Sequence, residues 1–132
     1  MLRSEAKLLV VDDLPTDRGF LVEILGDGGF TQIEQTYSGE NAVELAESYG
    51  PHMILMDTDM PRGMYGYEAC RIIREQCSRP LVIIGLSNIA TEERKRLWLE
   101  AGADDFFDKD VPDVDSSGFY QTLDNYLNGL EH

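Results

Sequence analysis

Six polar side chains that can carry chemistry stand at or just beyond the ends of short apolar runs in this 132-residue sequence: Asp12, Asp13, Asp57, Asp59, Ser87 and Lys109. If they meet, the carboxylates suppress one another's ionisation unless a cation neutralises them. All the donor atoms are hard oxygens, without imidazole or thiolate, which favours Mg²⁺, or Mn²⁺, over zinc or copper. A carboxylate can also be the nucleophile that forms an aspartyl-phosphate, with metal, lysine and serine sharing the charge of the transferred group.

Short apolar runs predict the strands that must position these groups. Three continuous runs, at residues 8–11, 53–56 and 81–84, have the pattern of strands buried on both faces, as in a parallel sheet. Two weaker strand candidates lie around residues 31–36 and 105–108. Successive candidates are roughly 20 to 28 residues apart, which is the spacing of βα units.

Helical periodicity fills the segments between and after the strands. Pro15 stands near the start of the first predicted helix, Thr91 is the expected N-cap of the fourth, and Gly102 follows its end. The sequence therefore predicts an α/β fold, (βα)₅, with a doubly wound parallel five-stranded sheet. Ligands of such sheets bind outside the carboxyl ends of the strands, where the six polar side chains fall.

Composition excludes several classes of function. The formal charge of −14 argues against direct binding to nucleic acids or membrane surfaces, because both need a basic face. No apolar run reaches the roughly 18 residues of a membrane span, and the N-terminus lacks the apolar region of a signal peptide. Cys70 and Cys77 are too far apart on one predicted helix for a disulfide, at roughly 10 Å. Free thiols and the missing export signal predict a cytoplasmic protein.

The chain has the size of one domain, which we place at residues 1–129. The last three residues, Leu-Glu-His, look like the start of a purification tag, so residues 130–132 are left out of the functional argument. His52 stands at a strand entrance, where a structural role is expected.

Each polar group also has a structural explanation. Asp12 or Asp13 can cap the first helix, although both are not needed for that. Asp59 can equally be a turn residue before Met60 and Pro61. Lys109 can be a solvated lysine, and Ser87 can lie at a helix N-terminus. Their joint placement at four strand ends is what favours a common site.

Four stretches of the sequence resemble the receiver domain of two-component response regulators, of the CheY type. They are VVDD (10–13), MILMD followed by MP (53–61), IIGLSN (83–88) and EAGADDFFDK (100–109), and the likeness covers essentially the whole chain. The resemblance implies the flavodoxin-like strand order 2-1-3-4-5. It also implies a phosphoprotein that acts as a signalling switch rather than an enzyme, although it catalyses its own phosphorylation and dephosphorylation.

The resemblance assigns metal-binding positions. Asp12 and Asp13 match the acidic pair that binds Mg²⁺ directly or through water. Asp57 matches the phosphoacceptor, which is also a metal ligand. Asp59 matches the position whose backbone carbonyl is a ligand.

The resemblance also implies the partners and the switch. The phosphoryl group comes to Asp57 from a histidine kinase or phosphotransfer protein. An effector protein or output domain then responds to the phosphorylated state. Ser87 matches the hydroxyl that moves to the phosphoryl group, and Lys109 the lysine that pairs with it. Phe106 matches the aromatic whose rotamer reports activation.

The sequence departs from the family pattern at several positions. Asp110 stands where the family usually has a proline, often after a cis bond, and we expect a trans bond here because the cis form of a non-proline bond costs about 2.5–4 kcal/mol. The loop after Pro61 is one residue longer than usual, and Asn88 replaces a small alanine. Phe106 lacks the hydroxyl of the usual tyrosine, which puts a hydrogen-bonded output switch in doubt.

Three other functions compete with a phosphorylated receiver. The run followed by Asp57-Thr58-Asp59 also fits haloacid-dehalogenase-type phosphatases, but there the remaining metal acids follow the lysine instead of preceding the nucleophile. A flavin- or phosphate-binding domain of the same topology is disfavoured by the acidic loop after the first strand. A receiver-like module that has lost phosphorylation is the third alternative.

Overall fold

The computed structural model describes residues 1–130. Its centre is one sheet of five parallel strands in the order β2-β1-β3-β4-β5, which confirms the predicted fold class and strand order. The strands are β1 (Lys7–Val11), β2 (Gln32–Thr36), β3 (Met53–Asp57), β4 (Val82–Ser87) and β5 (Asp105–Asp108). All residues of β3 and β4 are buried, as their unbroken apolar runs predicted.

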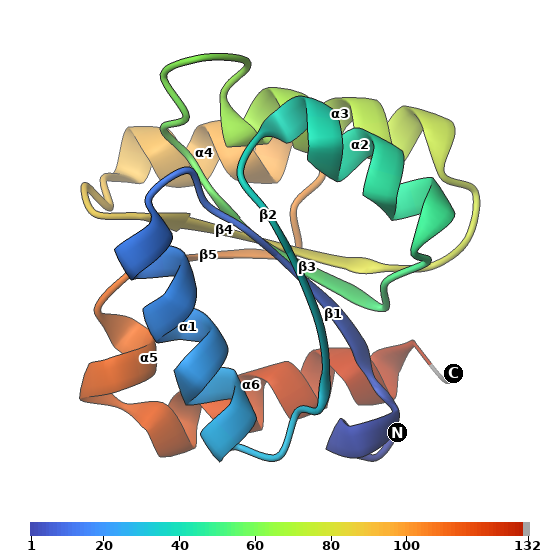
Figure 1. The fold of residues 1–132 in the computed structure, drawn as a ribbon. Helices are drawn as coiled ribbons and strands as arrows, with labels where there is room; N and C mark the ends of the chain where they lie inside the picture. Colours follow the sequence, from blue (N-terminus) through green and yellow to red (C-terminus); the bar gives the residue numbers. More distant parts are fainter. Residues whose placement is uncertain (131–132) are drawn as a thin grey trace.

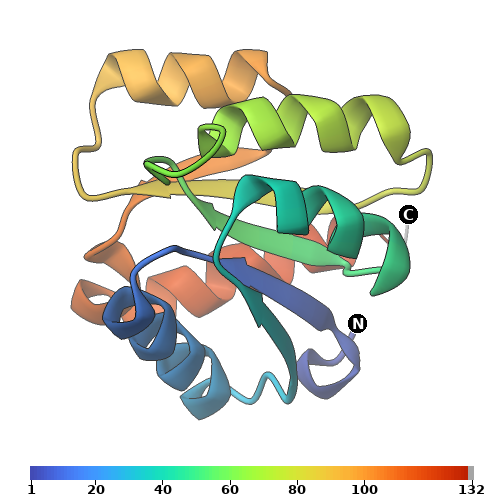
Figure 2. The ribbon, with the colours of Figure 1, turned by 45° about the horizontal axis from the view of Figure 1, so that its top comes forward.

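Helices cover both faces of the sheet (Figure 1). The layer on one face comprises α2 (Gly39–Ser48), α3 (Gly66–Gln76) and α4 (Glu92–Glu100). The layer on the other comprises α1 (Pro15–Asp27), α5 (Val111–Val114) and α6 (Ser116–Gly129). Figure 2 shows the same two layers from another angle.

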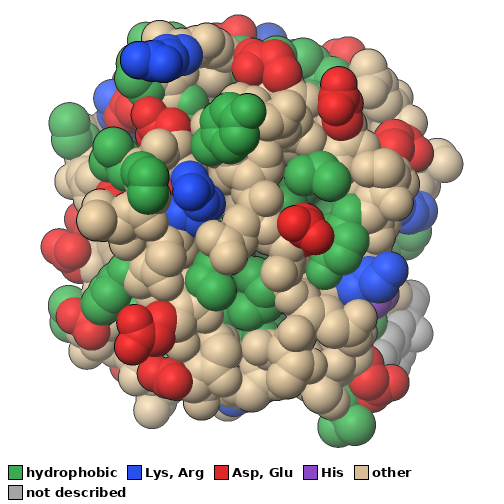
Figure 3. Space-filling view, in the orientation of Figure 1, with side chains coloured by type: hydrophobic (Ala, Val, Ile, Leu, Met, Phe, Trp, Pro, Cys, Tyr) green, Lys and Arg blue, Asp and Glu red, His purple; other side chains and the backbone are tan. Residues whose placement is uncertain are grey.

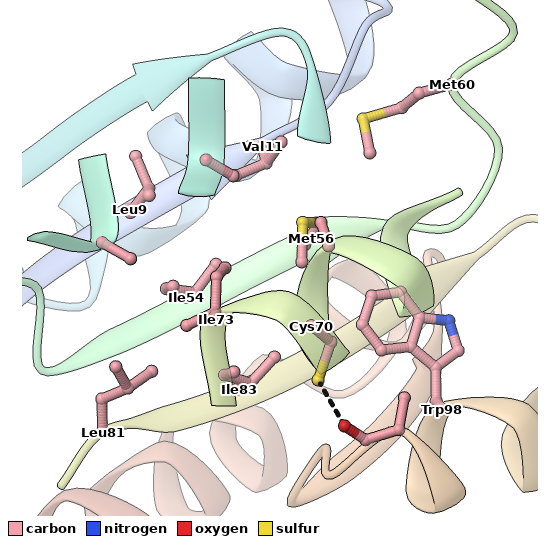
Figure 4. Close-up of a cluster of buried hydrophobic side chains, with 14 of the residues drawn as sticks. Leu9, Val11, Ile54, Met56, Met60, Cys70, Ile73, Leu81, Ile83 and Trp98 are labelled. Carbon is pink, nitrogen blue, oxygen red and sulfur yellow. Dashed lines mark hydrogen bonds between the residues drawn. The ribbon is translucent and has the colours of Figure 1, made fainter. Parts of the chain in front are cut away.

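Two apolar clusters fill the spaces between the sheet and the two helical layers. One joins β1, β3 and β4 to α2, α3 and α4, and it contains the fully buried Trp98 (Figure 4). The other lies under α1 and α6, and its buried helical members are Leu21, Leu25, Phe119, Leu123 and Leu127. Acidic side chains are spread around the visible face in Figure 3 and do not gather in one patch there.

Two short helices were not predicted. A 3-10 helix, η1 (Arg3–Glu5), precedes β1, and α5 adds one helical turn between β5 and the final helix. Pro112 lies in the first turn of α5, where its fixed φ and missing N–H are tolerated. Periodicity could not reveal α5, because a single turn is too short for a repeating apolar pattern to show. The described residues contain no cis peptide bond, so the bond between Lys109 and Asp110 is trans, as expected.

Several smaller predictions are confirmed. Pro15 begins α1, and the Thr91 hydroxyl accepts a hydrogen bond from the Arg94 N–H as the N-cap of α4. Cys70 and Cys77 are free thiols. His52 is structural, since its Nδ1 accepts the Lys7 N–H at 2.9 Å.

Two predictions concern the chain as a whole. The final helix ends at Gly129, and the predicted tag at 130–132 falls mostly outside the described residues. Within residues 1–130, no helix combines the length and the apolar character needed to cross a membrane.

Candidate functional site

The sheet brings the predicted side chains to one edge. Asp12 follows β1, Asp57 ends β3, Ser87 ends β4 and Lys109 follows β5. These four strands are adjacent in the sheet, and the pairing of Asp57 with Leu86 and of Ser87 with Asp108 aligns their carboxyl ends. The convergence predicted from the strand pattern is therefore present.

Three carboxylates form a compact oxygen cluster. Asp12, Asp13 and Asp57 each offer an oxygen, and these atoms lie within 4.8 Å of one another. Asp12 and Asp57 are buried, while Asp13 is half-buried. The donor set fits Mg²⁺ or Mn²⁺, because these cations bind hard oxygen ligands and usually retain several waters.

The carboxylate of Asp59 lies outside this cluster. Its Oδ2 accepts a hydrogen bond from Arg94 Nη1 at 2.8 Å, and the side chain is 47% exposed. The resemblance assigned the backbone carbonyl of Asp59, not its side chain, to the metal, and the ion pair with Arg94 is compatible with that assignment.

Lys109 is the positive charge of the site. Its Nζ lies 2.8 Å from Asp12 Oδ2, 3.0 Å from Asp17 Oδ2 and 3.1 Å from Asp57 Oδ1. Burial alone lowers the pKa of Lys109, but the hydrogen bond to Asp12 and the charge of Asp57 outweigh it, so the net pKa is raised. Lys109 is therefore a permanent cation beside the carboxyl group of Asp57, which excludes the explanation as a solvated lysine.

Burial disfavours the ionised forms of the two central acids. Desolvation, followed by the charge of Asp12, raises the pKa of Asp57 to about 7, although Lys109 opposes the shift. Burial also raises the pKa of Asp12, against the hydrogen bonds from Lys109 and from the Leu14 N–H. Without a bound cation, the site holds carboxylates that are costly to ionise.

The two predicted switch residues, Ser87 and Phe106, belong to the neighbouring strands β4 and β5. The Ser87 hydroxyl donates to the Ile89 carbonyl and accepts the Ile89 N–H, both at 3.0 Å, so it is bonded within the loop that leads to α4. Phe106 is 7% exposed and belongs to the same apolar cluster as Trp98. The movement of the Ser87 hydroxyl to a phosphoryl group and the rotamer change of Phe106 stay predictions.

Sequence reasoning missed four residues that contact the site. Asp17, in the first turn of α1, pairs with Lys109. Thr58, Arg94 and Trp98 form contacts around the segment that follows Asp57. The signal for Asp17 was its position in a first helical turn that begins beside Asp12 and Asp13. No sequence signal joined α4 to residues 58 and 59, which are distant in the chain.

The longer loop after Pro61 is held by α2. Glu40 Oε1 accepts the Met64 N–H at 3.0 Å, and a Cβ at Gly63 would lie 2.6 Å from Glu40 Oε2. The loop therefore approaches α2 closely at Gly63, against the end of the Glu40 side chain. On the other side of the site, Asp110 lines a hollow between α1 and α5 that reaches Lys109.

Comparisons with known proteins identify the family. The family model for the response regulator receiver domain matches residues 8–116. The chain belongs to this family, whose members are the receiver domains of two-component signalling and are characteristically phosphorylated on an aspartate. The oxygen cluster of Asp12, Asp13 and Asp57 fits the phosphoacceptor site of such domains.

The chain spans a third of one curated relative and nearly the whole of two solved receiver domains. The chain is 33% identical over 119 residues to a protein-glutamate methylesterase/protein-glutamine glutaminase of Natronomonas pharaonis, covering 90% of this chain and 33% of that protein. The receiver domain of Thermotoga maritima CheB matches with a TM-score of 0.81 at 26% identity, over 93% of this chain and 96% of that one. The receiver domain of the Arabidopsis thaliana histidine kinase CKI1, in complex with Mg²⁺, matches with a TM-score of 0.74 at 29% identity, over 90% and 92% of the two chains.

Proposed function

We propose that Asp57 accepts a phosphoryl group from the phosphohistidine of a histidine kinase or phosphotransfer protein. Receiver domains pair with partners of these two kinds. The observation that carries the proposal is the position of the Asp57 carboxylate, with Lys109 Nζ at 3.1 Å and oxygens of Asp12 and Asp13 within 4.8 Å. A nucleophilic oxygen thus lies between a fixed cation and a cluster suited to a second cation.

The transfer can be written with the residues of this site. An Asp57 oxygen forms a bond to phosphorus while the bond from phosphorus to the donor histidine nitrogen breaks, and the electron pair leaves with that nitrogen. The Lys109 ammonium orients the carboxylate and neutralises a phosphoryl oxygen. We assign Mg²⁺ to Asp12, Asp13, Asp57 and the Asp59 carbonyl, where it would neutralise the acids and the transferred group.

Phosphorylation would then act as a switch on a protein-interaction surface, with Ser87 and Phe106 as the responding residues. We propose that the domain itself is a signalling switch of the cytoplasm and not a metabolic enzyme, and that it binds neither nucleic acid nor membranes. The methylesterase relative carries a further two thirds of chain beyond the matched part, so its activity is not transferred to this domain.

Phosphorylation is tested with a small phosphodonor. With Mg²⁺ and acetyl phosphate, intact-protein mass spectrometry should show the gain of one phosphoryl group by the wild type and none by Asp57→Asn. An unmodified wild type would favour the module that has lost phosphorylation. Sustained hydrolysis of small phosphate esters would instead revive the phosphatase interpretation.

Metal binding is tested separately. Trp98 is the sole tryptophan, and its Nε1–H donates to the Thr58 hydroxyl next to Asp57, so its fluorescence should respond to Mg²⁺. Asp13→Asn should weaken that response at a given Mg²⁺ concentration. The control is Asp110→Asn, which removes a nearby acid outside the oxygen cluster. Equal Mg²⁺ affinity in Asp13→Asn and the wild type would remove Asp13 from the ligand set.

A further inference from the structure

Helix α4 contacts the chain immediately after the phosphoacceptor through two side chains. Arg94 and Trp98 are four residues apart, so they lie on one face of the helix. Trp98 Nε1–H donates to Thr58 Oγ1 at 2.9 Å, and Arg94 Nη1 donates to Asp59 Oδ2 at 2.8 Å. One helical face therefore binds two consecutive residues, directly beyond Asp57.

The tryptophan contact is fully buried. Thr58 Oγ1 accepts from Trp98 and donates to the Leu86 carbonyl at 2.7 Å, so its hydroxyl joins α4 to both β3 and β4. The indole lies between two glycines, since a Cβ at Gly85 or Gly66 would stand under 3.0 Å from its ring. A side chain seated in such a slot has little freedom to move without displacing Thr58.

Thr58 is bonded through all of its polar groups. Its N–H donates to the Leu86 carbonyl at 2.9 Å, and its own carbonyl accepts the Gly66 N–H at 2.9 Å. Together with the hydroxyl bonds, these contacts set the plane of the peptide that joins residues 58 and 59. The orientation of the next carbonyl, that of Asp59, depends on the same peptide and on the hold of Arg94 on its side chain.

The arginine contact also sets the charge of the site. Arg94 is only 25% exposed, and its ion pair keeps the Asp59 carboxylate outside the cluster of Asp12, Asp13 and Asp57. A free Asp59 carboxylate would add a fourth negative charge near that cluster.

We propose that Arg94 and Trp98 are positioning residues that fix the segment Asp57–Thr58–Asp59, so that the position of α4 and the geometry of the acidic site are linked. The contacts that would link α4 to the site are those of residues 58 and 59, and they do not involve Ser87 or Phe106. The link to the metal rests on the function proposed above. Because such a coupling is reciprocal, a change at α4 that alters Mg²⁺ affinity requires that Mg²⁺ alter α4 by the same factor.

A metal-free experiment tests the positioning itself. Hydrogen–deuterium exchange of the Thr58 amide, which donates to the Leu86 carbonyl, is followed by NMR in EDTA for the wild type, Trp98→Phe and Arg94→Gln. Each variant loses one hydrogen bond, so exchange should quicken roughly fivefold. Arg94→Lys, which keeps the charge, should restore part of the protection.

Arg96→Gln is the matched control for this experiment. Among the described residues, Arg96 pairs with Glu93 and Glu100 on its own helix, so its loss should leave exchange of the Thr58 amide unchanged. Unchanged exchange in both Arg94→Gln and Trp98→Phe, or an equal rise in Arg96→Gln, overturns the proposal whether or not the domain binds metal.

A second experiment tests the link to the cation. NMR follows the single indole N–H signal of Trp98 while Mg²⁺ is added to the wild type and to Arg94→Gln. Calorimetry measures the Mg²⁺ affinity of Trp98→Phe, which lacks this signal. The indole signal should shift in the wild type, and Trp98→Phe should bind Mg²⁺ roughly two- to fivefold more weakly, up to the value of one hydrogen bond. Mg²⁺ binding without an indole shift, and with equal affinity in Trp98→Phe, overturns the link while leaving the proposed function intact. A wild type that binds no Mg²⁺ overturns both the link and the metal site, but leaves the exchange result to stand by itself.

Discussion

Ionised Asp57 should destabilise the metal-free fold, so replacing it with asparagine should stabilise the protein as the pH rises. Burial and the charge of Asp12 raise the pKa of this carboxyl to about 7, against an ordinary value of 3.8. The folded protein therefore holds a proton that the unfolded chain releases. The contribution of Asp57 to the free energy of unfolding is therefore largest below about pH 4. This contribution decreases as the pH rises from about 4 to about 7.

The size of the effect follows from the two pKa values. Each pKa unit is worth about 1.36 kcal/mol, so full ionisation of Asp57 costs the folded state about 4 kcal/mol. About 2 kcal/mol of this cost arises between pH 5 and pH 7, because part of it has already arisen below pH 5, where the carboxyl group of the unfolded chain ionises. Asp57→Asn carries no titrating group at this position and should lack this loss.

Urea denaturation in EDTA at pH 5, 6, 7 and 8 measures the prediction as the difference between Asp57→Asn and the wild type. Burial lowers the pKa of His52, so the ionisation of His52 makes stability rise with pH, opposite to the effect of Asp57. Because His52 is present in both proteins, its contribution cancels in the difference. The free energy of unfolding of the variant should rise relative to the wild type by about 2 kcal/mol between pH 5 and pH 7.

Saturating Mg²⁺ is the second arm of the same measurement. A cation at the acidic cluster favours the ionised carboxylate, so the pH dependence of the wild type should flatten and its stability should rise. Parallel profiles for wild type and Asp57→Asn in EDTA would refute the reasoning, since they would show that Asp57 ionises without penalty in the fold.

Two other substitutions test the site and the core. Lys109→Met should lower the free energy of unfolding in EDTA by about 3 kcal/mol at pH 8, because the buried carboxylates of Asp12 and Asp57 lose their counter-charge. The loss should be smaller at pH 5, where Asp57 is protonated. Equal losses at both pH values would contradict this reasoning. Gly85→Ala should lower the stability by about 1–3 kcal/mol, because the new methyl group meets the Trp98 ring. Thermal denaturation measures it, with Gly26→Ala, which meets nothing within 4 Å, as the control.

The fold was largely predictable because its signals are local and repeat along the chain. Unbroken apolar runs indicated β1, β3 and β4, and the spacing of the candidates indicated parallel βα units. The strand order came from the family resemblance and not from the runs themselves. The single turn of α5 escaped prediction because it is too short to show a period.

The strand pattern of the sequence is enough to predict which groups meet at the site. Residues at the carboxyl ends of parallel strands share one edge of the sheet, so the pattern places Asp12, Asp57, Ser87 and Lys109 together. How those groups are held depends on contacts between elements that are distant in the chain. Asp17 pairs with Lys109 across 92 positions of sequence, and Trp98 bonds Thr58 across 40. Such contacts depend on how helices pack against the sheet, and packing depends on the shapes of many side chains at once, which no local pattern records.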